Sequence, residues 1–359
     1  MIDKIYKYRP LSDFLFKELF YNEIYFASYP ELNDPMDLTV KLNFKPVDSE
    51  RLDYLIYTLI KVSIFPSYEE NKIGVTVSPT SSLIKFAKDK VMRSELCNKL
   101  YSKIDTTEVF VSYDSVIEYL KPLAKEYDLN FRYEAHKKET ERRIKRFFEN
   151  SFSTSFSESY SDFLMWSHYA SKHQGICLEF TLENKGTFPY IQFAPRAKDE
   201  KKYKERYSEW ESKIGIFWDK IHKIKYLPEL PTINFYDFAP VFENEGDCDL
   251  MGLSKSKWHG YAYELENIFT HKTLDWKYEK EWRAIEINFQ DNKHPESRIR
   301  HYPNEALSRV YFGIRTPDEI KERIYQIISK QNSETDFYVA KLTDKRALEF
   351  EEWFSLTED

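Results

Sequence analysis

Glycine is scarce in this sequence, with 8 residues in 359, and no two glycines have the spacing of a phosphate-binding loop. The GxGxxG turn of dinucleotide-binding Rossmann domains and the GxxxxGK[ST] loop of Walker-type ATPases are both absent, and both need glycine where the backbone approaches phosphate. The GxSxG turn that carries a nucleophilic serine in α/β-hydrolases is absent as well. The sequence therefore excludes these three kinds of site.

Cysteine and long apolar runs are also rare. The three cysteines, Cys97, Cys177 and Cys248, form no CxxC pair, which argues against a cysteine-based zinc site or a disulfide framework. No apolar run approaches the roughly 18 residues of a membrane span. The first residues, MIDKIYKYRP, lack the apolar core of a signal peptide. We expect a reduced, cytoplasmic protein without a membrane partner.

The chain has enough apolar residues for a large core, and its net charge is negative. Hydrophobic residues make up 42% of the chain, charged residues 31%, and the net charge is −7. This balance argues against a basic surface for non-specific nucleic-acid binding. Residues 132–148 are an exception, with seven basic and three acidic residues. This segment is interpreted either as a solvated helix face or as a contact for phosphate-bearing ligands.

Residue patterns predict an α+β fold with a mixed or antiparallel sheet built from both ends of the chain. We expect one domain over residues 1–359, with an α+β core at 1–45 and 151–359 and a helical insertion at 46–150. Residues 227–260 are expected to be irregular, and the tail is expected to pack Phe350, Trp353 and Phe354 onto the body. The predicted strands are 4–9, 24–27, 151–157, 176–180, 282–289, 308–313 and 337–342. The predicted helices are 12–20, 50–62, 132–148, 162–173, 196–225 and one that begins near 317.

Two segments near the start carry candidate binding groups. Arg9 ends the strand KIYKYR, where an arginine can hold a phosphate or carboxylate through two parallel bonds, or can pair with a surface acid. The loop LNDPMD contains Asn33, Asp34 and Asp37. Asn33 or Asp34 can bind a ligand, Asp34 and Asp37 can hold a metal ion, and the segment can also be a simple turn.

Two later segments combine aromatic and ionisable residues. In the predicted helix 162–173, Trp166, Tyr169 and His173 share one face, which forms either a pocket wall or core. His168 and His173 are five residues apart, so they do not form the i, i+4 zinc pair of HExxH. The string YEKEWR places two glutamates at i, i+2, which point the same way if the segment is extended.

Two neighbouring glutamates repel, and the repulsion raises one pKa unless a cation lies between them. Glu279 and Glu281 are therefore either solvated acids paired with Lys280 and Arg283, or a catalytic carboxylate and its helper.

Taken together, these segments resemble the bacterial domain-of-unknown-function family 2971. The resemblance is carried by KYR at the start, LNDPxD, LMWSHYAxxHxGICLEF, YExEWR and the closing VYFGxxT. It covers nearly the whole chain in order, apart from 46–150 and 195–260. The family implies no activity by itself, and its members suggest a role in bacterial stress or phage defence.

The arrangement is also similar to ADP-ribosyltransferases. These enzymes carry a polar residue on an early strand, often Ser-Thr-Ser on a middle strand and a catalytic glutamate on a late strand. Arg9, the serines around Ser155 and the pair Glu279 and Glu281 occur here in that order, and Ser28 is an alternative to Ser155. Cleavage of the nicotinamide–ribose bond develops an oxocarbenium-like charge that a carboxylate stabilises.

The likeness implies NAD as substrate and a nucleic acid or protein as acceptor. Glu281 would stabilise the cation, Glu279 would orient or activate the acceptor, and Arg9 would hold phosphate. The residues that we predict to bind the nucleotide are Tyr8, Asn33, Asp34, Ser155, Trp166, His168, Tyr169, His173 and Arg283.

Two other classes of function stay open. A metal-dependent nuclease would arrange Asp34, Asp37, Glu279 and Glu281 around Mg²⁺. A non-enzymatic module would use the polar cleft to bind a nucleotide or a partner protein. A transferase needs Glu281 and NAD but no metal, whereas a nuclease loses its activity with a chelator.

Overall fold

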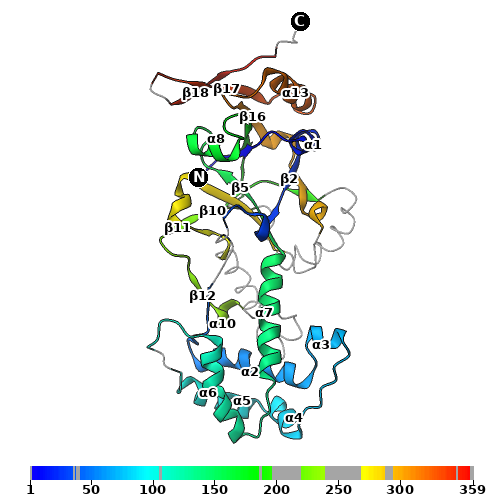
Figure 1. The fold of residues 1–359 in the computed structure, drawn as a ribbon, viewed down its shortest axis with the longest axis vertical. Helices are drawn as coiled ribbons and strands as arrows, with labels where there is room; N and C mark the ends of the chain where they lie inside the picture. The colour runs from blue at the N-terminus through cyan, green and yellow to red at the C-terminus, as the bar shows by residue number, and fades with distance from the viewer. Residues whose placement is uncertain are drawn as a thin grey trace. The chain divides into compact units, whose positions relative to one another are not determined.

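The computed structural model describes residues 2–34, 37, 41–104, 107–185, 188–195, 220–238, 268–287, 294–344 and 347–355. The chain divides into two compact units, and each is built from separate stretches of the sequence (Figure 1). The first unit comprises residues 1–37, 149–230 and 269–359, and the second comprises residues 38–148 and 231–268.

Nine of the described strands in the first unit form one mixed sheet, in the order β10-β14-β5-β1-β6-β16-β17-β18, with β3 also paired to β5. Neighbouring strands are antiparallel except β16 and β17, which are parallel. The strands are β1 (Lys4–Arg9), β3 (Ala27–Ser28), β5 (Ser151–Ser157), β6 (Ile176–Thr181), β10 (Ile221–Lys223), β14 (Glu281–Ile287), β16 (Leu307–Phe312), β17 (Asp336–Leu342) and β18 (Leu348–Glu352).

One face of this sheet is covered by α1 (Asp13–Tyr21) and α13 (Asp318–Ser329), which pack against each other. Ser12 caps α1 by accepting a hydrogen bond from the amide of Leu15, as expected for a serine at this position. The alternation of strand side chains sends the apolar residues of β1, β6 and β16 to this α1 face. The buried side chains there include Ile5, Leu15, Leu19, Ile176, Leu178, Phe180, Val310, Phe312, Ile324 and Ile328.

The opposite face is covered by α8 (Phe163–Tyr169). Its core contains Tyr8, Met165, Trp166, Ala170, Cys177 and Tyr311. Glu281, Ser157, Tyr6 and Glu179 are direct cross-strand partners in turn on four adjacent strands. Directly opposed residues share a face of a sheet, so both glutamates lie on this α8 face.

The described part of the first unit also contains shorter elements. They are β2 (Glu23–Tyr25), η1 (Tyr29–Glu31), β7 (Glu183–Lys185), β8 (Phe188–Tyr190), β9 (Ala194–Pro195), β11 (Lys225–Leu227), β13 (His271–Thr273), η3 (Leu274–Glu279), η4 (Pro295–Arg298), β15 (Ile299–His301) and η5 (Asn304–Ala306). β2, β15 and β9 form a small sheet, and β11 pairs in parallel with β13. β13 lies immediately before η3, and both β11 and β13 contact η3, so this pair fixes the start of the YEKEWR segment.

The second unit is mainly helical in the part that the structure describes. Its helices are α2 (Ser49–Ile64), α3 (Tyr68–Lys72), α4 (Ser81–Lys88), α5 (Lys90–Tyr101), α6 (Tyr113–Glu126), α7 (Tyr133–Glu149) and α10 (Phe235–Phe238), and β4 (Lys41–Asn43) pairs with β12 (Thr232–Asn234). α2 is buried along most of its length and contacts α5 and α4. Phe235 stacks on Phe44 with ring centroids 4.3 Å apart, so the two separate stretches of this unit share one core.

The predicted fold class is confirmed: the structure is α+β, with a mixed sheet that takes strands from both ends of the chain. Several local predictions are wrong. Residues 232–238, which were expected to be irregular, form β12 and α10. The helix predicted at 162–173 ends at Tyr169, because residues 171–173 adopt left-handed backbone conformations. The final stretch of the helix predicted at 196–225 forms β10 and the start of β11, while 196–219 lie outside the described residues.

A further wrong prediction concerns the tail. Residues 348–352 form the edge strand β18, which pairs with β17. Phe350 and Trp353 pack as expected, but Phe354 is exposed. In the described part of the chain, no helix is long and apolar enough to cross a membrane.

Candidate functional site

The two glutamates of YEKEWR meet at one buried lysine. Glu279 ends η3, Lys280 is left-handed with φ 47°, and Glu281 begins β14. The segment is therefore a turn, and the condition of an extended segment, under which the two glutamates would point the same way, is not met. Both carboxylates nevertheless contact the ammonium of Lys272 on β13, at 2.7 Å from Glu279 Oε2 and 3.3 Å from Glu281 Oε2. Lys272 is the cation that keeps this carboxylate pair together.

Arg283 extends the cluster to the loop near the start of the chain. Its Nε lies 2.5 Å from Glu281 Oε1, and its Nη2 lies 2.9 Å from Glu281 Oε2. Its other edge binds Asp37, with Nη1 2.8 Å from Oδ1 and Nη2 2.5 Å from Oδ2. Arg283 therefore makes paired hydrogen bonds to two carboxylates, the geometry for which a planar guanidinium is suited. Lys272, Glu279, Glu281, Arg283 and Asp37 are all at least 95% buried.

Tyr169 links Glu279 to the surface. Its hydroxyl donates to Glu279 Oε1 and accepts a hydrogen bond from the Asn33 side-chain amide at 2.6 Å. Asn33 is exposed. The LNDP loop, helix α8 and the YEKEWR turn thus meet at this point, and a chain of hydrogen bonds runs from Asn33 through Tyr169 and Glu279 to Lys272.

The cluster moves the pKa values of the two glutamates in opposite directions. Burial raises the pKa of Glu281, but Arg283 and Lys272 outweigh it and bring the pKa to about 2. For Glu279, burial and the Glu281 charge outweigh Lys272, and the pKa is raised. Burial alone would lower the pKa of Lys272, yet Glu281 and Glu279 keep it above its usual range.

This separation gives the two carboxylates different states. Glu281 stays ionised, whereas Glu279 is the carboxyl of the pair that takes up a proton first. When Glu279 is neutral, two cations (Lys272 and Arg283) balance two anions (Asp37 and Glu281). Two carboxyls with pKa values pushed apart by their surroundings are the arrangement that enzymes use for acid–base and nucleophilic roles.

One known family matches the central part of the chain. Residues 165–284 match the family described as protein of unknown function (DUF2971). The matched span contains both the WSHYA helix and the YEKEWR turn, so the family resemblance drawn from these motifs is confirmed there. No curated protein and no solved structure matches the chain.

Two of the predicted ligand-binding residues lie in the aromatic core on the α8 face. The Trp166 ring, within the DUF2971 match, is fully buried, and its Nε1 donates to the carbonyl of Tyr160 at 2.7 Å. Tyr8 packs edge-on against Trp166 at 5.3 Å and donates to the carbonyl of Ser159 at 2.9 Å. These contacts occupy both rings, so neither presents a free face to a nucleotide.

Arg9 lies away from the glutamates. It forms an ion pair with Glu18 of α1, and its cross-strand partner is Ile176, so its side chain belongs to the α1 face. Arg9 therefore lies on the opposite side of the sheet from Glu281, and it is not placed to hold a phosphate beside that glutamate as we predicted. The alternative prediction for Arg9, an ion pair with an acid, agrees with its contact to Glu18.

The remaining predicted residues are divided between the cluster and its surroundings. Ser155 is the cross-strand partner of Arg283, and its side chain contributes to the lowered pKa of Glu281. Asp34 is buried, and its carbonyl accepts from the amide of Asp37 at 3.1 Å. His168 is exposed beside Tyr278, at 6.1 Å between ring centroids. His173 is buried beyond the end of α8.

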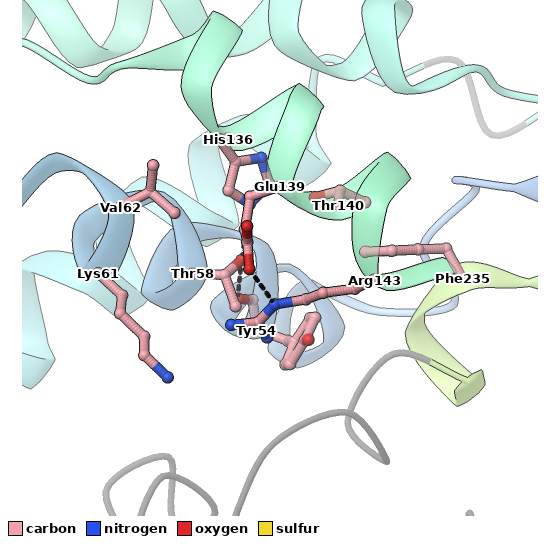
Figure 2. Close-up of a pocket in the computed structure, with 9 residues that line it drawn as sticks. All are labelled: Tyr54, Thr58, Lys61, Val62, His136, Glu139, Thr140, Arg143 and Phe235. Carbon is pink, nitrogen blue, oxygen red and sulfur yellow. Dashed lines mark hydrogen bonds and ion pairs between the residues drawn. The ribbon is translucent and has the colours of Figure 1, made fainter. Parts of the chain in front are cut away.

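The basic helix of the second unit is largely neutralised by local acids. Arg132 pairs with Glu70, Lys137 with Asp114, and Arg142 and Arg143 with Glu139. A cavity of about 20 Å³ lies beside α7, lined by residues that include His136, Glu139, Thr58 and Arg143, and Figure 2 shows these side chains converging on it. This volume holds about one water molecule.

His136 in that cavity is part of the packing. Its Nε2 lies 2.9 Å from the Thr58 hydroxyl and its Nδ1 2.8 Å from the Tyr113 hydroxyl. Burial and Arg143 lower its pKa to about 3. A neutral histidine with both nitrogens bonded supplies no charge to a phosphate, so the cavity does not support the phosphate contact considered for this segment.

The nuclease alternative lacks a vacant position for a metal. Of its four acids, Asp37, Glu279 and Glu281 converge, but each is bound to Lys272 or Arg283. Across the described ranges, no group of three metal-ligating side chains is arranged around a common point.

Two members of the cluster were missed at the level of sequence. Lys272 lies in a three-residue strand outside every motif, and Tyr226, whose hydroxyl accepts from the Glu281 amide at 2.7 Å, lies in another. One signal for Lys272 was available from the sequence: two neighbouring glutamates are expected to have a cation between them. That expectation did not identify which residue supplies the cation.

Proposed function

We propose that this protein cleaves the nicotinamide–ribose bond of NAD in the manner of an ADP-ribosyltransferase, with Glu281 and Glu279 as the reacting carboxylates. The observation that supports this most is the buried pair whose pKa values are pushed apart around Lys272. The sheet order adds support, since β14, which begins with Glu281, is paired with β5, which carries Ser155.

In this proposal the ionised Glu281 stabilises the cation that forms as nicotinamide leaves. Glu279 exchanges a proton with the attacking group through Oε1, where Tyr169 is bonded. Lys272, Arg283 and Asp37 hold the two carboxylates in place. Asn33, exposed and bonded to Tyr169, is the polar group nearest to an incoming substrate along this chain of hydrogen bonds.

The test is nicotinamide release from NAD by the purified protein, with and without EDTA, using nucleic acid and lysate protein as acceptors. We expect release that resists EDTA and is abolished by Glu281→Gln, which keeps the shape and removes the charge. Glu279→Gln should weaken transfer to the acceptor more than nicotinamide release, because the amide that replaces the carboxylate cannot accept a proton.

Glu286→Gln is the matched control. Glu286 is on the same strand, is equally buried and is ion-paired with Arg300, but it faces the other side of the sheet. Circular dichroism establishes that each variant is folded. Equal losses of activity in Glu281→Gln and Glu286→Gln, or no nicotinamide release under any condition, would contradict the proposal.

A non-enzymatic binding module is the second candidate, and one observation favours it. Every carboxylate of the cluster already has a cationic partner, and such networks also serve to hold a fold together. The module predicts an NAD- or nucleotide-dependent rise in melting temperature without release of nicotinamide. Binding without turnover in the assay above would select it.

A further inference from the structure

The residues that follow α8, including His173 and Gly175, meet the VYFGIRT segment at residues 310–316. The amide of Arg315 donates to the carbonyl of His173 at 3.0 Å, and the amide of Gly313 donates to the carbonyl of Gly175 at 3.0 Å. Both glycines are required by close packing: a Cβ on Gly313 would lie 2.2 Å from the His173 carbonyl oxygen, and one on Gly175 would lie 2.2 Å from that of Arg9. The backbone therefore fixes His173 against the VYFGIRT segment.

The His173 ring is buried with no hydrogen bond of its own. It is 7% exposed, and neither Nδ1 nor Nε2 has a partner. The ring lies against Phe163, with centroids 4.5 Å apart, and parallel to Trp166 at 6.5 Å. A buried polar group left without a partner costs about 1–3 kcal/mol, so the site favours any occupant that supplies one.

The charge around His173 is positive. Arg315 acts on it electrostatically, and no acid does so among the described residues. The Arg315 side chain is exposed, and in the described part of the chain it has no ion pair or hydrogen bond. Lys172, also exposed, precedes His173 in the turn where residues 171–173 all have positive φ. The Arg315 guanidinium has no ion pair among the described residues, and the His173 nitrogens have no hydrogen bond. Together these groups are suited to bind an anion.

We propose that His173 and Arg315 form a binding site for a phosphate group. The imidazole donates one hydrogen bond to a phosphate oxygen, and the guanidinium supplies the charge-assisted bonds. Both ring nitrogens are closed off from solvent, so the exposed Phe163, which packs on the ring, must shift for the phosphate to reach them. This site is separate from the NAD chemistry proposed above and does not depend on it.

The test titrates inorganic phosphate into the full-length protein by calorimetry at constant ionic strength, and follows the His173 imidazole by ¹⁵N-histidine NMR. We expect binding that shifts the His173 resonances and weakens at least about tenfold in Arg315→Gln, the loss of one charge-assisted bond. His173→Asn should weaken binding as well, and asparagine tolerates the left-handed backbone at this position.

Lys330→Gln is the matched control, because it removes one exposed charge elsewhere in the first unit. Adenosine monophosphate, added as a competitor, tells whether the phosphate group of a nucleotide enters the same site. His173 resonances that do not respond to phosphate would show that phosphate does not reach the ring, and the proposal would fall. An equal loss of binding in Arg315→Gln and Lys330→Gln would also overturn it.

Discussion

Replacing Lys272 with methionine removes the cation that Glu279 and Glu281 share. The side chain of Lys272 lies 2.7 Å, 3.3 Å and 3.6 Å from oxygens of Glu279, Glu281 and Asp37. Methionine fills a similar volume but leaves three carboxylates with only Arg283 for compensation. We expect the variant to be folded less stably, and the loss to depend on pH.

The magnitude follows from the burial of the cluster. Removing one partner from a buried ion pair costs about 3–5 kcal/mol, because a charge is left uncompensated away from water. The variant can relieve this by protonating Glu279, whose pKa is already raised. A group whose folded pKa exceeds its unfolded value stabilises the protein at low pH and loses that contribution as pH rises. The loss should therefore be larger at pH 8 than at pH 5.5.

The assay is urea unfolding at both pH values, followed by circular dichroism and tryptophan fluorescence. Lys280→Met is the control, because Lys280 is the exposed neighbour of both glutamates, and an exposed substitution changes the free energy of unfolding by less than about 0.5 kcal/mol. In the double variant Lys272→Met/Glu279→Gln one uncompensated charge is gone, so part of the stability should return and the pH dependence should weaken. A loss below about 1 kcal/mol, or one equal at both pH values, would refute this account of the cluster.

Two further predictions concern packing and pH. Gly175→Ala should lower the free energy of unfolding by about 1–3 kcal/mol, since the added methyl meets the Arg9 carbonyl oxygen; wild-type stability in urea would contradict the close approach. Because the folded pKa of His136 is about 3, its contribution to stability is full above pH 6.5 and falls by about 1.4 kcal/mol per pH unit below it. His136→Gln cannot titrate, so its melting temperature should fall less steeply between pH 6.5 and 5, and an unchanged slope would assign the acid sensitivity to other groups.

Local patterns were sufficient for most of the fold. The alternation in KIYKYR and SFSTSFS predicted β1 and β5, and the serine before DFLFKELF predicted the start of α1, because period and capping are properties of a few neighbouring residues. The end of α8 was not predictable in this way. Gly175 suggested a left-handed stop, whereas the left-handed residues are Ser171, Lys172 and His173 and the glycine is needed for contact with the distant Arg9 carbonyl.

The candidate site shows the same division between local and distant information. The motif strings identified Glu279, Glu281, Tyr169 and Asn33, which the structure brings together. Lys272 could not be identified, because its role comes from where a three-residue strand places one side chain. Arg9 was placed near the glutamates by its order in the chain, although strand alternation sends it to the opposite face of the sheet.

The central strand β1 has a consequence for synthesis of the chain. Tyr6 pairs with Ser157 and with Glu179, so β1 has no partner on either side until more than 150 further residues have been made. At 5–20 residues per second this wait lasts roughly 8–30 s. A lone apolar strand would invite aggregation during that time, and interspersed charges are the usual protection. Lys4, Lys7 and Arg9 supply that protection to the nascent strand before their native partners exist.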